Sequence, residues 1–332
     1  MRILITGGGG FLGSEIIRQL APQGHTLHSL ATRRHPHLDQ LGVRQWQGDI
    51  ADPRLVNAAV RSCDAVIHTA ALAGVWGAAG AFHRTNVRGT VNVINACRAN
   101  GVNRLVYSSS PSVVFSGSDQ EGIDESAPYP DSWLTHYQRT KSDAEIRVLQ
   151  ANSSALSTVA LRPHLIWGPG DRHLIPRILQ RARAGRLHVV GSGDQLIDAV
   201  YIDNAARAHI LALNGLKPGA AMAGRAYFIT NHEPWPLRKI LNGILAAAGL
   251  PPLPARTLPG PLAYGVGAVL EGIWKLTGRR QEPPMTRFLA QQLGTAHWYD
   301  PAAAMRDLGY RPEISMAEGL QRLSVSLNSR TS

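Results

Sequence analysis

Tyr137 and Lys141 stand four residues apart in the segment Tyr-Gln-Arg-Thr-Lys, inside a stretch whose pattern predicts a helix. Residues four apart lie on one face of a helix, so the phenol and the ammonium can point into the same cleft. A cation beside a phenol stabilises the phenolate and lowers a pKa that is about 10 when unperturbed. We therefore expect Tyr137 to donate and accept a proton near neutral pH. The alternative is an ordinary pair on a surface helix.

A run of hydroxyl groups lies upstream of this pair. Four serines end or follow the apolar segment 104–108, which predicts a strand: Ser108, Ser109, Ser110 and Ser112. Ligands of parallel sheets bind outside the carboxyl ends of the strands. We therefore expect the serine run to face a ligand on the same side of the sheet as Tyr137.

Three glycines at three-residue spacing, Gly7, Gly10 and Gly13, join the β-branched segment 3–6 to a helical pattern that starts at Phe11. A turn without side chains lets backbone N–H groups and the positive end of a helix converge on a diphosphate. A flexible linker is the alternative, but linkers are not flanked by apolar segments of this kind. The sequence therefore predicts a dinucleotide-binding turn.

Strand-like and helix-like segments alternate through the first half of the chain. The expected strands span residues 3–6, 26–31, 44–47, 65–68, 104–108 and 158–162. This alternation predicts an α/β fold with a Rossmann-like, doubly wound parallel sheet. We assign residues 1–168 to the nucleotide-binding domain and residues 169–332 to a smaller C-terminal substrate-binding region. Segments 199–202 and 226–229 are candidates to return to the main sheet, and residues 116–126 are expected to form an ordered loop.

The end of the second expected strand bears on the choice between the two nicotinamide dinucleotides. Enzymes that use NAD normally place Asp or Glu there, on the 2′-hydroxyl of the ribose. This chain has Ala-Thr-Arg33-Arg34 instead, and a guanidinium can hold a 2′-phosphate through two hydrogen bonds. We predict NADPH and NADP⁺ as the cofactor pair. An arginine-rich background composition is the competing explanation for these two residues.

Composition limits the classes of partner and compartment. The formal net charge is +11, from 34 Lys and Arg against 23 Asp and Glu. No basic run of five or more residues accompanies this charge, so a nucleic-acid partner is not expected. Two cysteines and the lack of a leader pattern predict a reducing, cytoplasmic compartment.

The uncharged stretch 258–270 is too short to span a bilayer. We expect a buried helix or a lid helix here. The alternatives are a contact with the membrane interface and the wall of an apolar substrate channel. Peripheral attachment to the inner face of the membrane therefore stays open, and Tyr264 is a candidate substrate contact.

Together these motifs resemble the extended short-chain dehydrogenases/reductases, and the full-length pattern resembles their 3β-hydroxysteroid dehydrogenase branch. Within that branch the chain is most similar to the bacterial 2-alkyl-3-oxoalkanoate reductases of long-chain olefin biosynthesis. Five further segments carry the similarity, at residues 73–77, 165–171, 201–204, 282–288 and 297–299. The resemblance implies that Ser110 bonds the substrate oxygen, that Tyr137 is the proton donor and that Lys141 binds the cofactor ribose.

The resemblance also implies a set of cofactor contacts, in which Asp49 bonds the adenine amino group and Asn86 holds the active-site structure. The expected contacts are Gly7, Gly10, Phe11, Leu12, Gly13, Arg33, Arg34, Asp49, Ile50, Thr69, Ala70, Ala71, Asn86, Ser108, Tyr137, Lys141, Pro163 and His164. The candidate substrate contacts are Ser112, Arg172, His173 and Tyr264. For the substrate carboxylate the candidates are Arg172, His173 and His164. No metal is expected.

The implied reaction is the NADPH-dependent reduction of the C3 ketone of a 2-alkyl-3-oxoalkanoate, a lipid-like β-keto acid, in olefin and β-lactone biosynthesis. The implied partners are a thiolase-like condensing enzyme, a β-lactone synthetase and a β-lactone decarboxylase. A homodimer through the helices expected at residues 86–99 and 137–149 is also predicted. The alternatives are a 3β-hydroxysteroid or sterol-4-carboxylate 3-dehydrogenase, a nucleotide-sugar epimerase or dehydratase, and a non-catalytic NADP sensor.

Overall fold

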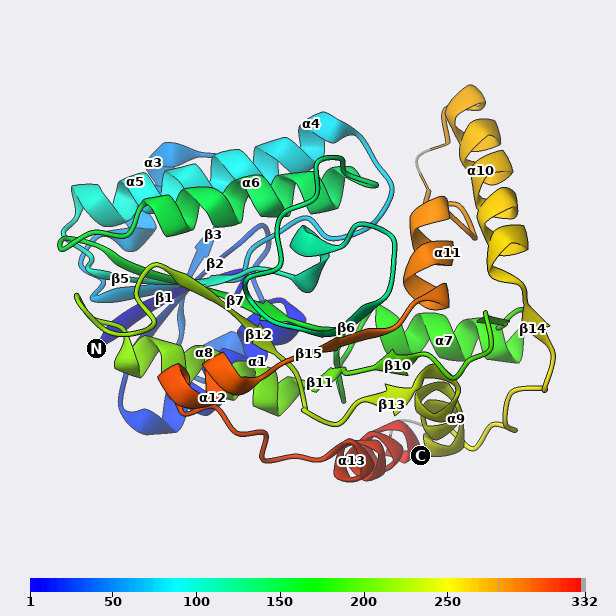
Figure 1. Ribbon diagram of the computed structural model, residues 1–332. Helices are drawn as coiled ribbons and strands as arrows, with labels where there is room; N and C mark the ends of the chain where they lie inside the picture. The colour runs from blue at the N-terminus through cyan, green and yellow to red at the C-terminus, as the bar shows by residue number, and fades with distance from the viewer. Residues whose placement is uncertain (280, 330–332) are drawn as a thin grey trace.

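The expected site residues should meet at the carboxyl edge of one parallel sheet, and the computed structural model contains such a sheet (Figure 1). The structure describes residues 1–279 and 281–329. In this part of the chain, seven parallel strands pair in the order β3-β2-β1-β4-β5-β7-β12. Their bounds are Arg2–Thr6 (β1), Thr26–Ala31 (β2), Arg44–Gln47 (β3), Ala65–His68 (β4), Arg104–Ser108 (β5), Ser157–Pro163 (β7) and Arg225–Ile229 (β12). The predicted doubly wound fold is confirmed.

Side chains of the strands alternate between two hydrophobic clusters, one on each face of the sheet. In β1, Ile3 and Ile5 belong to one cluster and Leu4 to the other, and all three are fully buried. This alternation follows from the two-residue period of a strand. Both faces of the sheet are therefore apolar, as a sheet covered by helices on both sides requires.

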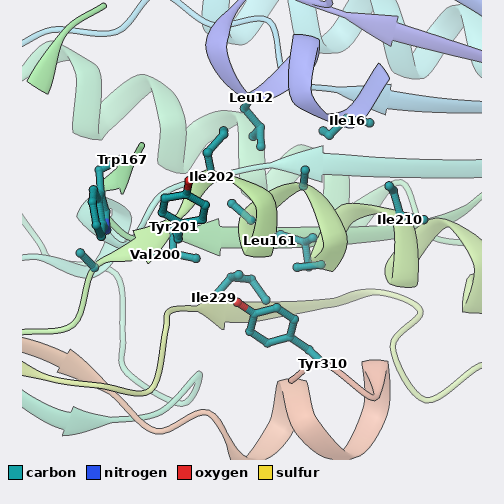
Figure 2. Packing of buried hydrophobic residues seen from close by; sticks show 14 of the residues in the cluster. Leu12, Ile16, Leu161, Trp167, Val200, Tyr201, Ile202, Ile210, Ile229 and Tyr310 are labelled. Atoms are coloured by element: carbon teal, nitrogen blue, oxygen red, sulfur yellow. The ribbon is translucent and has the colours of Figure 1, made fainter. Parts of the chain in front are cut away.

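Helices cover both faces (Figure 1). The first face carries α1 (Phe11–Leu20) and α8 (Ile202–Gly215). Figure 2 shows Leu12 and Ile16 of α1 beside Ile202 and Ile210 of α8, within one buried cluster. The second face carries α3 (Pro53–Val60), α5 (Gly89–Ala99) and α6 (His136–Gln150). The helix α6 contains the expected catalytic pair.

Four of the six expected strands have the predicted bounds, and β1 and β7 are longer by one residue at one or both ends. The return of residues 226–229 to the main sheet is confirmed, because β12 pairs with β7. The return of residues 199–202 is wrong. The position beside β7 is taken by β12, so β11 (Val200–Tyr201) pairs with the short β8 (Ile166–Trp167) instead, and Ile202 begins α8.

A second sheet links the two halves of the chain. Its strand order is β13-β10-β15-β6, with bounds Gln120–Ile123 (β6), Leu196–Ile197 (β10), Trp235–Pro236 (β13) and His297–Tyr299 (β15). The loop expected at residues 116–126 thus contains a strand. The sequence gives little sign of β6, because Gly122, with a φ of +63°, interrupts it. The main sheet includes β12 from the part after residue 168, and the second sheet includes β6 from the part before it. The boundary expected at residue 168 therefore does not separate the two sheets.

The remaining elements are short connectors of the main sheet or belong to the C-terminal region. The connectors are η1 (Ala21–Gln23), α2 (Pro36–Asp39), α4 (Ala79–Phe82), η2 (His83–Arg88) and η3 (Pro111–Val114). The others are α7 (Leu174–Arg183), β9 (Val189–Val190), α9 (Leu237–Ala247), β14 (Thr257–Leu258), α10 (Gly260–Leu276), α11 (Arg287–Gly294), α12 (Ala302–Leu308) and α13 (Met316–Asn328).

The uncharged stretch 258–270 forms β14 and most of α10, which is not a buried helix, and the lid helix stays a prediction. Only Ala263 and Gly267 of α10 are buried. A Cβ on Gly267 would lie 2.6 Å from the carbonyl carbon of Thr286, so small residues let α10 approach α11 along a narrow seam. Within the described residues, no helix has both the length and the apolar content needed to cross a membrane.

Candidate active site

The first turn of α6 is fixed against the serine segment that follows β5. Thr135 caps the helix: its Oγ1 accepts from the backbone N–H of Gln138 (3.2 Å), and Gln138 Oε1 accepts from the N–H of Thr135 (3.1 Å). Gln138 Nε2 also donates to the carbonyls of Ser112 (3.2 Å) and Phe115 (3.0 Å). This capping box therefore sets both the start of α6 and its distance from the serines.

Tyr137 and Ser110 meet at this junction. The Ser110 side chain acts on the Tyr137 phenol, and the Ser110 hydroxyl lies 2.9 Å from that of Ser112. Burial raises the pKa of the Tyr137 phenol above its ordinary value, and the hydrogen bond with Ser110 offsets part of that rise. The phenol is therefore a neutral proton donor at physiological pH, aligned with a second hydroxyl.

Lys141 is buried beneath this pair. Its Nζ donates to the carbonyl oxygen of Ser108 (2.6 Å) and lies 4.2 Å from the centre of the Tyr107 ring. Burial lowers the pKa of Lys141 to about 7, against the opposing effect of the Glu145 carboxylate. The prediction that Lys141 lowers the pKa of Tyr137 is not met in this structure, because burial raises the pKa of the phenol and Ser110, not Lys141, opposes that rise.

We expect Lys141→Met to stabilise the fold, and to do so more at pH 6 than at pH 9. The pKa of Lys141 falls from about 10.4 in the unfolded chain to about 7 in the fold, so the unfolded state binds more protons between these values. The cost to stability is full below pH 7 and disappears as the pH rises above the unfolded pKa. Thermal unfolding of both proteins at pH 6 and pH 9 measures this. A variant less stable than the parent protein at pH 6 would contradict it.

Two buried polar residues near the site, Asn86 and His68, form hydrogen bonds between neighbouring segments. Asn86, in the π-helical turn η2, accepts from the N–H of Leu72 (2.7 Å) and donates to Thr140 Oγ1 (3.1 Å). His68 lies between the hydroxyls of Thr6 (2.7 Å) and Thr90 (2.9 Å). Burial, and secondly the Lys141 charge, lower the pKa of His68 to about 3, so it is neutral. Asn86 thus ties the segment after β4 to the catalytic helix.

The glycine turn forms a cradle without side chains. A Cβ on Gly13 would lie 2.3 Å from the carbonyl oxygen of Gly7, and Gly7 itself has a φ of +71°. Gly10 begins α1 without a side-chain cap, and the first turn of α1 has no acidic residue. Its first N–H groups are therefore available to an anion, with Thr69 and Ala70 of the segment after β4 alongside. The residues present fit a dinucleotide diphosphate.

The two arginines after β2 have different surroundings. Arg34 forms a two-bond ion pair with Asp39 (2.9 and 3.1 Å). Arg33 is exposed and has no ion pair with any residue that the structure describes. His35 packs against the turn, since a Cβ on Gly9 would overlap its ring at 2.0 Å. Arg33 is therefore the cation that remains open to a ligand at this strand end.

Arg172 lies on the cofactor side, which corrects its expected place beside the substrate carboxylate. Burial lowers the pKa of His35, and the nearby Arg33, His37 and Arg172 lower it further. The chain reaches this place because the loop after β8 crosses the glycine turn: a Cβ on Gly170 would lie 4.0 Å from the Phe11 ring. The end of β2 is therefore a cluster of positive charge.

Two further expected cofactor contacts lie after β3. Asp49 accepts from Arg84 (2.6 Å) and from the N–H of Ala51 (2.8 Å), and Ile50 is buried. An adenine amino group at Asp49 would compete with Arg84. Nothing in the sequence marks Arg84 as a partner of Asp49. Ala71 is exposed after β4, and Pro163 ends β7.

The four expected substrate contacts have different surroundings. The Ser112 hydroxyl lies 2.9 Å from that of Ser110. Arg172 faces the cofactor side, as described above. His173 is exposed at the start of α7, with its N–H bonded to Asp171 (2.8 Å). Tyr264 is 40% exposed on α10. The positions of these candidate substrate residues are set by how long loops cross the surface.

His164 is also unsuited to the substrate carboxylate. It is buried at the end of β7, and its Nδ1 bonds the carbonyl of Asp198 (2.9 Å). Burial, then the neighbouring His297, lower the pKa of His164 to about 3. A neutral imidazole cannot supply the positive charge that this role needs.

A buried ion pair that is not evident from the sequence lies behind the site. Glu145, one turn beyond Lys141 on α6, accepts from Arg162 of β7 (2.6 and 3.0 Å) and from the Tyr129 hydroxyl (2.7 Å). Both charged side chains are almost fully buried. The four-residue spacing between Lys141 and Glu145 is visible in the sequence, whereas nothing local marks Arg162 as its partner.

The parallel sheet, the glycine turn and the Ser110, Tyr137 and Lys141 group define an extended short-chain dehydrogenase/reductase. The chain belongs to the 3-beta hydroxysteroid dehydrogenase/isomerase family, whose model matches residues 4–258. The resemblance identified from the motifs is thereby confirmed.

Relatives of the chain include proteins named as alkanoate reductases and proteins named as sterol dehydrogenases. A 2-alkyl-3-oxoalkanoate reductase of Stenotrophomonas maltophilia (strain K279a) is 51% identical, over 98% of this chain and 99% of the relative. A protein of the same name from Shewanella oneidensis is 48% identical, over 97% of this chain and 85% of the relative. The mouse sterol-4-alpha-carboxylate 3-dehydrogenase, decarboxylating, is 33% identical over 96% of this chain and 88% of its own length.

Solved structures share the fold over the whole chain. The crystal structure of gox2253 has a TM-score of 0.79 at 25% identity and covers 99% of this chain and 98% of its own. A UDP-glucose 4-epimerase of Thermotoga maritima has the same TM-score at 18% identity, over all of both chains. The epimerase shows the fold alone.

Proposed function

We propose that this protein reduces the C3 ketone of a 2-alkyl-3-oxoalkanoate to a 2-alkyl-3-hydroxyalkanoate, with NADPH as the hydride donor. The observation that carries the oxidoreductase chemistry is the grouping of Ser110, Tyr137 and the buried Lys141, whose Nζ donates to the carbonyl oxygen of Ser108 (2.6 Å). The substrate class comes from the two bacterial relatives of that name, which match nearly the full chain at 51% and 48% identity.

Ser110, Tyr137 and Lys141 have different roles in the reaction. A bound NADPH supplies the hydride to C3 of the substrate. Ser110 donates a hydrogen bond to the ketone oxygen and fixes the carbonyl beside Tyr137. As negative charge develops on that oxygen, the Tyr137 phenol donates its proton to it. Lys141 binds the ribose and keeps a positive charge near the phenolate that remains.

The raised pKa of Tyr137 suits the direction of reduction. A phenol with a pKa above its ordinary value remains protonated at neutral pH, so the donor form is ready before substrate binds. The cofactor's ribose and phosphates would bring negative charge toward Lys141 and favour its ammonium form. The proton donor of the site is therefore in its protonated form before the reaction begins.

The positive cluster at the end of β2 supports NADPH over NADH. Arg33 is exposed there without an ion pair among the described residues, and Arg172 adds positive charge around His35. No carboxylate occupies the place where an NAD enzyme would bind the ribose 2′-hydroxyl. A 2′-phosphate would meet two guanidinium groups.

Arg33→Ser should weaken NADP⁺ binding by about 10- to 100-fold, the loss of charge-assisted hydrogen bonds worth about 1.5–3 kcal/mol. NAD⁺ binding should be nearly unchanged. Arg34→Ser is the matched control, because Arg34 is already paired with Asp39. Calorimetric titration of each variant with both dinucleotides measures the effect. Equal losses for NAD⁺ and NADP⁺, or a larger loss in the Arg34 variant, would remove Arg33 from the phosphate site.

The sterol dehydrogenase alternative is favoured by one observation, the 33% identity to the mouse enzyme. A 2-alkyl-3-oxoalkanoate and a 3-oxo sterol-4-carboxylate share one group, a carboxylate one carbon away from a ketone. The two activities therefore differ in the carbon skeleton that the pocket accepts and not in the reacting atoms.

A paired substrate assay decides between them. NADPH consumption with a 2-alkyl-3-oxoalkanoate is compared with NADP⁺ and NAD⁺ reduction by a sterol-4-carboxylate and by a simple 3β-hydroxysterol, with product analysis. We expect turnover of the alkyl β-keto acid at least 100-fold more efficient than that of either sterol. Turnover of sterols alone would overturn the proposal.

The proposal also includes the compartment, the protein partners and the oligomeric state. We place the protein in the cytoplasm, in an assembly with a thiolase-like condensing enzyme, a β-lactone synthetase and a β-lactone decarboxylase. The homodimer would pair α5 and α6 with their copies. Co-purification from cells that express all four proteins, with light scattering of the purified protein, tests both statements.

A further inference from the structure

Helix α10 carries an apolar stripe along its outer side. The stripe consists of five exposed residues, Leu262 (55%), Val266 (40%), Val269 (63%), Ile273 (42%) and Leu276 (89%). Their spacing alternates between four and three residues, so the side chains form one line along the helix. Single apolar side chains on a surface are ordinary, whereas a continuous line of them indicates a contact surface.

The opposite side of α10 packs on α11 through the seam at Ala263 and Gly267 described above. Figure 1 shows α10 at the edge of the molecule, with α11 between it and the sheets. Trp76 Nε1 donates to the carbonyl of Arg279 (3.3 Å), which ties the segment after α10 to the loop after β4. The stripe is therefore held outward by a fixed helix.

The charges around α10 leave an excess of cations. Segment 256–287 contains two acidic residues, and both are paired: Glu271 with Arg287 (2.8 Å) and Glu282 with Arg177. The exposed Arg256, Lys275 and Arg279 have no ion pair with any residue in the described part of the chain. Arg279 instead lies over the Trp274 ring, 4.8 Å from its centre. An apolar line thus has basic residues near both of its ends.

The size of the stripe argues against a second copy of the chain as its partner. Seventeen residues form a helix about 25 Å long and about 10 Å wide, a footprint of about 250 Å². A stable interface buries about 800 Å² on each partner. A bilayer needs no matching surface, because the apolar side of a helix enters the headgroup region while flanking Lys and Arg bind anionic lipid.

We propose that α10 docks this protein on the surface of an anionic phospholipid bilayer, with the helix in the plane of the membrane and the Leu262 to Leu276 stripe inserted. Arg256, Lys275 and Arg279 then contact the headgroups. Docking in this way sets the loop after β4, and with it the rim of the catalytic site, close to the lipid phase.

Flotation with vesicles of phosphatidylglycerol and phosphatidylcholine, and with vesicles of phosphatidylcholine alone, tests this surface. We expect the full-length protein to float with the anionic vesicles and at least tenfold less with the neutral ones. Val269→Glu with Ile273→Glu should reduce flotation at least tenfold. Val325→Glu is the matched control, because Val325 is 71% exposed on a different helix, α13.

Circular dichroism of the double variant confirms that the fold is intact, and light scattering gives its oligomeric state. Lys275→Glu with Arg279→Glu, which leaves the stripe unchanged, should remove the preference for anionic lipid. No flotation of the parent protein, or an equal loss in the Val325 variant, would overturn the proposal. So would a change from dimer to monomer in the double variant without any lipid binding, which would assign the stripe to a second copy.

Discussion

Replacing Tyr137 with Phe should lower the turnover number for ketone reduction by about 10²- to 10⁴-fold, the usual contribution of a general acid. The change removes one hydroxyl from a site in which Gln138 and the Thr135 cap fix the helix independently of Tyr137. The affinity for NADPH should therefore change by less than about threefold. Stopped-flow measurement of NADPH oxidation and titration of NADPH fluorescence give the two quantities.

Tyr227→Phe is the matched control for that variant, since it removes a phenol oxygen that bonds Asp307 of α12, outside the Ser110, Tyr137 and Lys141 group. Its turnover should equal that of the parent protein. A Tyr137→Phe variant with unchanged turnover would reject the assigned proton donor. Loss of NADPH binding in the same variant would make Tyr137 a binding residue and leave the proton donor unassigned.

Replacing Arg162 with Met should lower the free energy of unfolding by about 3 to 5 kcal/mol, the usual cost of removing one partner of a buried ion pair. Glu145 would then be a buried carboxylate whose remaining polar partner is the Tyr129 hydroxyl. The carboxylate also faces Lys141 along α6, so the loss of Arg162 should raise the pKa of the Lys141 ammonium. Urea denaturation measures the stability.

The double variant Arg162→Met with Glu145→Leu separates the ion pair from the packing around it. Removing both charges should recover most of the lost stability, because apolar groups of similar volume often replace a buried pair at little cost. Arg322→Met, which breaks an exposed pair with Glu318, is the surface control and should shift the urea midpoint far less. A loss as large for Arg322 as for Arg162 would contradict the role given to burial.

The residues found from sequence lie in local patterns. Gly7, Gly10 and Gly13 belong to one turn, and Tyr137 and Lys141 to one helix, so spacing alone predicts their shared faces. Chain order then placed the serine run at the same edge of the sheet, because the carboxyl ends of parallel strands lie together. The strands 26–31 and 65–68 were equally visible, since each is a short apolar run between helices.

The residues that sequence analysis misplaced depend on packing between distant segments. Arg172 was assigned to the substrate, yet the loop after β8 carries it across the glycine turn toward His35. Glu145 and Arg162 meet only because α6 packs on β7 in one register. The pKa direction of Tyr137 failed for a similar reason: neighbours in sequence predict the charge nearby but not the depth of burial.

In the proposed mechanism, hydride reaches C3 of the substrate at the Ser110, Tyr137 and Lys141 site. Supplying NADPH that carries deuterium at both C4 positions together with a 2-alkyl-3-oxoalkanoate, and following the label by mass spectrometry and NMR, measures this transfer. We predict one deuterium on C3 of the 2-alkyl-3-hydroxyalkanoate product, formed about 10²- to 10⁴-fold more slowly by Tyr137→Phe. A product without the label, or labelled at an unchanged rate by that variant, would contradict the account.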